Sequence, residues 1–310
     1  MSALICGSFA FDTIMVFPGQ FKNEILPDKV HMLNVSFLVP ELRREFGGTA
    51  GNIAYNLNLL GGSVLPMGTV GDDFDNYAAW MDQCGISRKY VKQVAGTYTA
   101  QAYITTDLDD NQITAFHPGA MNHAHTQEIP AKGIKIGSIS PDGRDGMIQH
   151  AAQFADAGVP FLFDPGQGLP MFTGAELRSF IQQASYCAVN DYESELLMER
   201  TGWKLKQIAE RLDALIVTRG GKGSHIITKK KTFEIPVAQA SALADPTGCG
   251  DAYRGGLLYG LQKGMDWETT GRIAALMGAI NIERPGTQNH KFTLEQFRAR
   301  FKKEFRYELR

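Results

Sequence analysis

Short apolar runs alternate with amphipathic stretches along most of this 310-residue chain. The apolar runs have the length and the Val, Ile and Leu content of buried strands, and they occupy Ala3–Cys6, Ser63–Val70, Ile134–Ile139, Pro160–Asp164, Tyr186–Val189 and Ala214–Thr218. Helical periodicity occupies the segments Gly51–Leu60, Phe74–Cys84, Asp145–Ala157, Gly174–Ala184 and Tyr192–Thr201. This alternation predicts an α/β fold with a central, mainly parallel sheet and helices on both faces, in three layers.

Two segments, residues 13–45 and 97–118, interrupt the alternation. Both are rich in β-forming residues and short turns, and Thr97–Thr106 alternates as a half-buried strand does. We therefore expect the two excursions to form one small β-sheet, and a sheet with one face over a cleft serves as a lid. Because no repeat or disordered linker is present, residues 1–310 are predicted to form one domain that carries this lid.

The C-terminal part of the chain adds three predicted elements. Ser224–Thr228 and Thr232–Pro236 flank a run of lysines and are expected to form a hairpin. A long helix is predicted over Trp267–Ile282, and the tail Thr293–Arg310 is typical of an amphipathic surface helix.

The composition is that of a soluble enzyme. With 31 basic and 33 acidic residues the net charge is −2, so nothing favours nucleic acid or an anionic membrane as a partner. No apolar run reaches the roughly 18 residues of a membrane helix, and the N-terminus lacks the basic region of a signal peptide. The four cysteines are far apart and unpatterned, which favours reduced thiols and a cytoplasmic location.

The strongest chemical signal is the heptapeptide Asp-Pro-Thr-Gly-Cys-Gly-Asp at Asp245–Asp251, which leads into an apolar helix. Its glycines leave the amides of Gly248, Cys249 and Gly250 uncovered at the helix start, where unpaired donors and the helix dipole favour phosphate. Asp251 is placed to accept a proton from a hydroxyl that attacks phosphorus. A plain turn with an acidic N-cap is the alternative, and neither a P-loop nor the dinucleotide-binding glycine pattern is present.

Four motifs, in order along the chain, resemble those of the ribokinase-like (PfkB-type) carbohydrate and nucleoside kinases. They are Glu45–Asn52 with its glycine pair, the Asn-x-x-Glu of Asn190–Glu193, the Thr-x-Gly-x-x-Gly of Thr218–Gly223 and the heptapeptide itself. The subgroup of bacterial adenosine kinases and related broad-specificity nucleoside kinases is the most similar, on the phrases Phe17–Gly19, Ser36–Val39, His117–Met121 and Gly286–Gln288. The resemblance implies a ribokinase-like fold with a β-lid over the sugar, and ATP and Mg²⁺ as cofactors.

The acceptor side is predicted from the first strand and the glycine pair. Ser8 and Asp12 follow the exit of that strand, where a carboxylate can accept two hydroxyl hydrogen bonds from a ribose, as the aligned Asp does in the family. Gly47 and Gly48 allow the backbone to approach a ligand closely, and Asn52 offers both a donor and an acceptor. A turn Asp and a helix-entry turn are the alternative interpretations.

An aromatic side chain would mark a nucleobase site, since bases stack on aromatic faces for roughly 1–3 kcal/mol each. Phe116 lies at the position where adenosine kinases of this subgroup carry a base-stacking Phe, although core packing of the lid is the alternative. Ala102 departs from the second aromatic expected on the neighbouring lid strand, which opens room for other bases. Gln167, after a strand end, is a further candidate contact to the acceptor.

The donor side is predicted from the remaining two motifs. The resemblance assigns Asn190 to the nucleotide and Glu193 to Mg²⁺ through water, which suits an ion that retains several waters; helix capping is the alternative for this pair. Thr218, Gly220 and Gly223 form a strand-to-turn segment whose amides are expected to meet ATP.

A monovalent cation site is also implied by the resemblance. In several relatives the loops that correspond to Asp245, Thr247 and the segment after Ile282 bind such a cation, often K⁺. Asp245 and Thr247 are therefore candidates, although the sequence does not fix the ligands.

The main prediction is ATP-dependent phosphorylation of the 5′-hydroxyl of a purine ribonucleoside, as in adenosine kinases, with Asp251 as general base. A broader kinase for inosine, guanosine or cytidine, a ribokinase or other sugar kinase, and a nucleoside-binding sensor without catalysis remain open. Lid strands pair between subunits in several relatives, so a homodimer through the lid is a further prediction.

Overall fold

The computed structural model describes residues 1–25, 32, 34–109, 111–130 and 132–309. Within these residues the larger sheet has nine strands in the order β13-β12-β11-β10-β9-β8-β1-β4-β5. Their bounds are β1 Ser2–Cys6, β4 Val64–Val70, β5 Tyr90–Gln93, β8 Ile134–Ile139, β9 Phe161–Phe163, β10 Tyr186–Asn190, β11 Ala214–Thr218, β12 Ser224–Thr228 and β13 Thr232–Ile235. Neighbouring strands are parallel except in the β11-β12-β13 part, which is antiparallel and contains the predicted hairpin.

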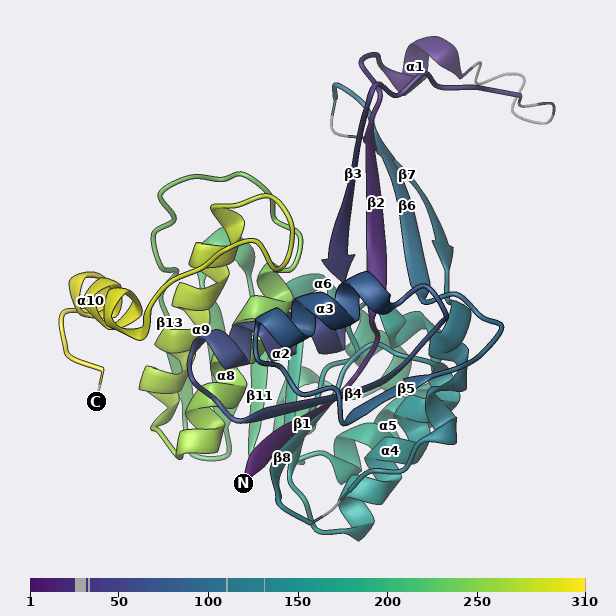
Figure 1. The fold of residues 1–310 in the computed structure, drawn as a ribbon. Helices are drawn as coiled ribbons and strands as arrows, with labels where there is room; N and C mark the ends of the chain where they lie inside the picture. Colours follow the sequence, from purple (N-terminus) through teal and green to yellow (C-terminus); the bar gives the residue numbers. More distant parts are fainter. Residues whose placement is uncertain (26–31, 33, 110, 131, 310) are drawn as a thin grey trace.

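The central strands are mainly apolar because the middle of the sheet is buried on both faces. In β1, Ala3 and Ile5 pack into one core, and Leu4 and Cys6 pack into the other. The first core is covered by α2 Thr49–Leu59, α3 Asp75–Gln83, α8 Cys249–Lys263 and α9 Trp267–Ile282. The second core is covered by α4 Arg144–Asp156, α5 Gly174–Gln183, α6 Asp191–Thr201 and α7 Leu205–Ala209. The predicted three-layer α/β/α arrangement is confirmed (Figure 1).

The observed bounds of the helices differ from the predicted ones mainly at the helix ends, where capping residues lie. The helix predicted over Gly51–Leu60 begins earlier, at Thr49, because Gly48 with φ 85 already turns the chain out of strand geometry. The amphipathic tail helix α10 runs over Leu294–Phe305 and packs through Phe297 and Phe301. The short helices are α1 Phe21–Glu24, η2 Gly119–Thr126, η3 Gly166–Met171 and η4 Gly220–Lys222. None of the helices in the described ranges is long and apolar enough to cross a membrane.

The strand order reverses at β1, which places a crevice at the carboxyl ends of the strands. The chain passes from β1 to β4 and β5 on one side and then crosses to β8 on the other. Ligands of open α/β sheets bind at such a reversal. Ser8 follows β1, Asp164 follows β9, and Asn190 and Thr218 end β10 and β11, paired with each other in register.

The two predicted excursions form one four-stranded sheet that rises from this edge of the molecule (Figure 1). Its strands are β2 Ala10–Val16, β3 Glu41–Gly47, β6 Ala100–Thr106 and β7 Gln112–His117, in the order β3-β2-β6-β7. The small lid sheet is therefore confirmed. Parts of both excursions, residues 26–31, 33 and 110, lie outside the described residues.

Candidate active site

The first turn of α8 builds the predicted anion site. Gly248 precedes the helix with φ 78, a left-handed conformation that favours glycine, and a Cβ there would meet the Thr287 methyl group at 2.8 Å. The Cys249 amide, predicted to face the anion, instead bonds back to the preceding loop at 3.2 Å. The amides of Gly250 and Asp251 have no acceptor within the described part of the chain, so this turn presents unpaired donors.

Asp251 lies in the same turn, with its Oδ2 accepting a hydrogen bond from Asn52 Nδ2 at 2.8 Å. Burial raises the pKa of Asp251 to about 7; the charges of Asp164 and Asp12 act in the same direction, whereas the Asn52 amide and the Arg254 guanidinium oppose the shift. A carboxyl group with a pKa close to neutrality is suited to accept a proton at physiological pH.

Asn52 is 4% exposed, and most of its amide group is committed to protein partners. Its Oδ1 accepts from Thr287 Oγ1 at 2.8 Å and from Gln288 Nε2 at 3.0 Å. Gln288 Nε2 also donates to the Tyr77 hydroxyl at 2.6 Å, and Tyr77 donates to the Gly47 carbonyl at 2.9 Å. The sequence predicted Asn52 as a ligand that offers both donor and acceptor, yet only one of its amide hydrogens remains for a substrate.

Arg254 is a site residue that the sequence analysis missed. It lies one turn after Asp251 and is 5% exposed. Its Nη2 donates to Asp164 Oδ1 at 3.0 Å and to the Ala188 carbonyl at 3.2 Å, and it lies 4.0 Å from Glu193 Oε2. The sequence feature that could have identified Arg254 is an Arg within an apolar helix pattern, since a buried guanidinium requires carboxylate partners.

Lid residues line up across the four strands in one row. Glu45 pairs with Asp12, Asp12 with Ala102, and Ala102 with Phe116. Paired residues share a face of a sheet, and Asp12 interacts electrostatically with Asp251, so this row faces the start of α8. Phe116 is 50% exposed and Ala102 is 8% exposed, so the predicted sugar and base contacts are separated by a small side chain.

Asp12 is largely buried beside the glycine pair. Burial raises the pKa of Asp12 to about 6, and the neighbouring carboxylates Glu45 and Asp245 contribute to the shift. A Cβ on Gly47 would meet Asp12 Oδ2 at 2.3 Å, so this glycine makes room for the carboxyl group.

Gly48 with φ 85 brings α2 against the chain that leaves β1. A Cβ on Gly48 would lie 2.6 Å from the Ser8 carbonyl oxygen. The Ser8 hydroxyl accepts from the Thr49 amide at 3.2 Å, so Ser8, a predicted substrate contact, also caps the start of α2.

The predicted donor residues lie along the neighbouring strand ends. Asn190 and Glu193 form a capping box: Asn190 Oδ1 accepts from the Glu193 amide at 2.7 Å, and Glu193 Oε2 accepts from the Asn190 amide at 2.8 Å. Burial raises the pKa of Glu193. Thr218 ends β11, and Gly220 and Gly223 follow with φ 53 and 77. Asn190 and Glu193 therefore do cap the helix α6, as the alternative interpretation had it, and the role of Glu193 toward Mg²⁺ stays a prediction.

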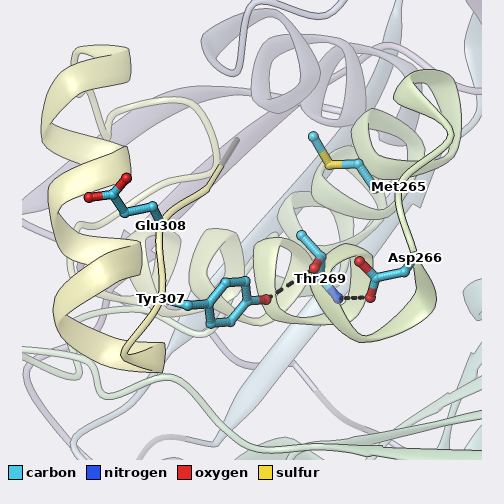
Figure 2. Close-up of a pocket in the computed structure, with 5 residues that line it drawn as sticks. All are labelled: Met265, Asp266, Thr269, Tyr307 and Glu308. Carbon is cyan, nitrogen blue, oxygen red and sulfur yellow. Dashed lines mark hydrogen bonds between the residues drawn. The ribbon is translucent and has the colours of Figure 1, made fainter.

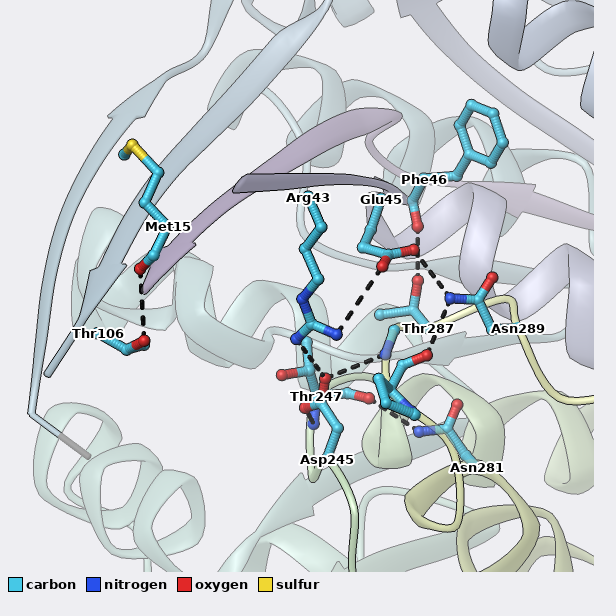
Figure 3. Close-up of polar contacts among 12 residues, drawn as sticks. Met15, Arg43, Glu45, Phe46, Thr106, Asp245, Thr247, Asn281, Thr287 and Asn289 are labelled. Carbon is cyan, nitrogen blue, oxygen red and sulfur yellow. Dashed lines mark hydrogen bonds and ion pairs between the residues drawn. The ribbon is translucent and has the colours of Figure 1, made fainter. Parts of the chain in front are cut away.

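Asp245, one of the two predicted cation residues, pairs with Arg43 of the lid (Figure 3). Asp245 Oδ1 accepts from the Thr247 amide at 2.9 Å, and its Oδ2 accepts from the Gly286 amide at 3.0 Å. Arg43 reaches from β3 to within 3.3 Å of the same Oδ2 and also lies 3.9 Å from Glu45. Burial opposes the shift, but the hydrogen bonds from Gly286 and Thr247, together with the charge of Arg43, lower the pKa of Asp245. The Arg43 guanidinium is thus a cationic partner that this carboxylate already has.

The chain matches the pfkB family of carbohydrate kinases over residues 12–293. A nucleoside kinase of Methanocaldococcus jannaschii is 34% identical over 272 residues, which make up 87% of this chain and 90% of that protein. A Burkholderia thailandensis nucleoside kinase in complex with inosine has a TM-score of 0.90 and 53% identity over 99% of both chains. Its complex with ADP-inosine has a TM-score of 0.88 and 55% identity, over 99% of this chain and 97% of that one.

This chain belongs to the pfkB family of carbohydrate kinases. The family predicted from four motifs is thereby confirmed, and so is the ribokinase-like fold. The protein is an enzyme, a phosphotransferase whose acceptor is an alcohol group.

Of the residues predicted for this pfkB-family site, Gln167 is exposed on η3, and its contact to the acceptor stays a prediction. Thr287 and Gln288 entered the sequence analysis only as part of a subgroup phrase, and their contacts to Asn52 became visible only in the fold.

A cavity of about 520 Å³ lies elsewhere, lined by Met265, Asp266, Thr269, Tyr307 and Glu308 (Figure 2). Met265 follows the C-terminal end of α8, roughly 22 Å along the helix from the anion site at 1.5 Å per residue. This cavity is therefore separate from the candidate active site.

The close packing around Asn52 yields a stability prediction. A Cβ on Gly51 would meet the Tyr77 hydroxyl at 1.9 Å and Gln288 Nε2 at 3.2 Å. Gly51→Ala is therefore expected to destabilise the protein by about 1–3 kcal/mol, because buried side chains must shift. Urea unfolding measures the loss. Gly221→Ala, where a Cβ meets nothing within 4 Å, is the matched control; equal midpoints for the two variants would contradict the packing argument.

Proposed function

We propose that this pfkB-family enzyme is a nucleoside kinase that transfers the γ-phosphoryl group of ATP to the 5′-hydroxyl of a ribonucleoside. The observation that carries the proposal is the placement of Asp251 beside the unpaired amides at the start of α8, opposite the lid row that contains Asp12 and Phe116. The complexes of the Burkholderia thailandensis enzyme with inosine and with ADP-inosine support a nucleoside acceptor and an adenine nucleotide donor.

We infer that the enzyme accepts several nucleosides and not adenosine alone. The Methanocaldococcus jannaschii and Burkholderia thailandensis relatives described above are named nucleoside kinases, and the latter is complexed with inosine. In this chain the row across the lid places only Ala102 between Asp12 and Phe116. One exposed aromatic face stacks any base, whereas a second ring would narrow the slot. The broader kinase, the alternative left open by the sequence, is therefore the proposal.

The proposed mechanism follows from the charges on the lid side and on the α8 side of the site. Asp12 accepts hydrogen bonds from the ribose hydroxyls and so directs the 5′-oxygen toward Asp251. Asp251 accepts the proton from that oxygen as the oxygen attacks the γ-phosphorus in line, the bond from that phosphorus to the bridging oxygen breaks, and ADP leaves. The amides of Gly250 and Asp251, at the positive end of the α8 dipole, stabilise the charge on the transferring group. The lid excludes water, which would otherwise compete as an acceptor.

Mg²⁺ fits the donor side of this arrangement. Glu193 is partly buried at the carboxyl edge of the sheet, 4.0 Å from Arg254, with its second oxygen outside the capping box. A carboxylate in this position suits contact to Mg²⁺ through water, because Mg²⁺ retains several waters and takes few protein oxygens. When bound with ATP, the ion neutralises phosphate charge. Arg254 pairs with Asp164 and lies beside Glu193, and so holds both carboxylates in position.

The role of Asp251 is tested by Asp251→Asn. We expect kcat to fall by about 10²–10⁴ because the proton acceptor is lost. The matched control is Asp266→Asn, which changes the N-cap carboxylate of α9 and replaces one good cap with another. Steady-state ADP release measures both variants. An Asp251→Asn enzyme with the kcat of the control would refute the assignment.

The raised pKa of Asp251 predicts the pH dependence. The base must be ionised, so kcat is expected to rise through pH about 7 and to level off above it. The sign for stability is opposite: the raised pKa favours folding below the ordinary value of 3.8, and this contribution is lost as pH rises to about 7. The Tm of Asp251→Asn should therefore exceed that of wild type at pH 8 but not at pH 4. Flat profiles in both measurements would contradict the burial of this group.

The acceptor class is tested with a panel of adenosine, inosine, guanosine, cytidine and ribose under Mg·ATP. We expect turnover of several nucleosides at lower KM than ribose. Phe116→Ala should raise the nucleoside KM by about tenfold, from loss of a stacking contact of roughly 1–3 kcal/mol, and leave the ribose KM unchanged. Ile113→Ala changes an exposed residue on the other face of β7 and should alter neither. Equal effects of Phe116→Ala on nucleosides and ribose would exclude a base contact.

A further inference from the structure

The loop Pro285–Asn289 lies between the lid and the catalytic carboxyl group. Its Gly286 amide bonds to Asp245 at 3.0 Å, and its Asn289 Nδ2 donates to Glu45 on β3 at 2.8 Å. Thr287, at its centre, is 2% exposed. The loop therefore contacts the last residues of a lid strand, the approach to the anion site and the support of Asp251 at the same time.

The Thr287 hydroxyl has one proton and two acceptors. Its Oγ1 lies 2.6 Å from the Phe46 carbonyl and 2.8 Å from Asn52 Oδ1, and neither of these oxygens can donate in return. Asn52 Oδ1 already accepts from Gln288, whereas the Phe46 carbonyl belongs to the base of lid strand β3. The two acceptors therefore share one hydroxyl proton in this arrangement of the lid.

We propose that Thr287 is a positioning residue that couples the lid to Asp251: its hydroxyl orders the base of β3, and the same atom, with Gln288, fixes the Asn52 amide that bonds to the catalytic carboxyl group. This inference rests on the proposed role of Asp251. Movement of β3 redistributes the Thr287 proton and so changes how firmly Asn52 is held.

The Thr287 methyl group has a separate contact. A Cβ on Gly248 would lie only 2.8 Å from this methyl group, so the methyl packs against the residue that begins the anion site. Hydroxyl and methyl are therefore distinguishable by mutation, because valine keeps the methyl and loses the hydroxyl, and serine does the reverse.

The test compares Thr287→Val and Thr287→Ser in the full-length enzyme with adenosine or inosine and Mg·ATP. In Thr287→Val we expect kcat to fall about tenfold, the effect of losing one buried hydrogen bond in the positioning of a catalytic group, with the KM for ATP changed by less than about twofold. Thr287→Ser should retain kcat. The lower limb of the kcat profile should move to higher pH in the valine variant, because the Asn52 amide that favours ionised Asp251 is held less firmly.

The shift of the pH profile reports on Asp251, because the substitution leaves the other charged or titratable groups around it unchanged. These groups are Asp12, Asp164, Arg254, Tyr77 and Cys249. Thr69→Val is the matched control. Thr69 is 1% exposed on β4 and donates to the Ala120 carbonyl at 2.7 Å, so it loses a comparable buried hydroxyl away from the site. It should lower Tm without changing kcat or the pH profile.

Two results would overturn the proposal: a Thr287→Val enzyme with wild-type kcat and pH profile, or equal losses in the valine and serine variants, which would assign the effect to packing. If the valine variant does not fold, Thr287→Cys, with a weaker donor, replaces it, and kcat below that of the serine variant is then required. The two failures are distinguishable. If the proposed role of Asp251 is wrong, Asp251→Asn stays active; if only the coupling through Thr287 is wrong, Asp251→Asn is still inactive.

Discussion

A partly buried carboxyl group at the start of α8 is the constraint on which the rest of this structure depends. Burial and the charges of Asp12 and Asp164 disfavour ionised Asp251, and the Asn52 amide and the Arg254 guanidinium counteract them. Asn52 is held on α2, and Arg254 is held by strand ends on the far side of the crevice. The two helices and the 285–289 loop must therefore be packed together before this carboxyl group has the properties of a base.

The distribution of charge also separates the two substrates. The lid side of the site carries Asp12 and Glu45, which suit the hydroxyl groups of a sugar and repel phosphate. The α8 side offers amides and the positive end of a helix dipole, which suit phosphate. Arg43 neutralises Asp245 between the two regions. In the proposed function, a neutral, hydroxyl-rich acceptor and an anionic donor would thus bind on opposite sides of Asp251.

The fold was largely predictable because its pattern is local. In the strand β11, the four residues Ala214–Val217 are buried on both faces and are therefore all apolar, and the intervening helices carry a regular apolar stripe. The lid was predictable as a small sheet because its excursions lack helical periodicity. The order of its strands was not, since β2 and β6 pair across a separation that no short-range pattern encodes.

The sequence by itself determined the family, the α/β layers and the heptapeptide Asp245–Asp251 that begins α8, because glycines at a helix start constrain the backbone wherever that helix lies. Only the tertiary structure decided what surrounds the carboxyl group. Asn52 donates to Asp251, Arg43 pairs with Asp245, and Thr287 contacts both the lid strand β3 and Asn52. These contacts join residues up to 241 positions apart, and a side chain's hydrogen-bond partners depend on where the packed cores bring it, which residue type and spacing do not specify.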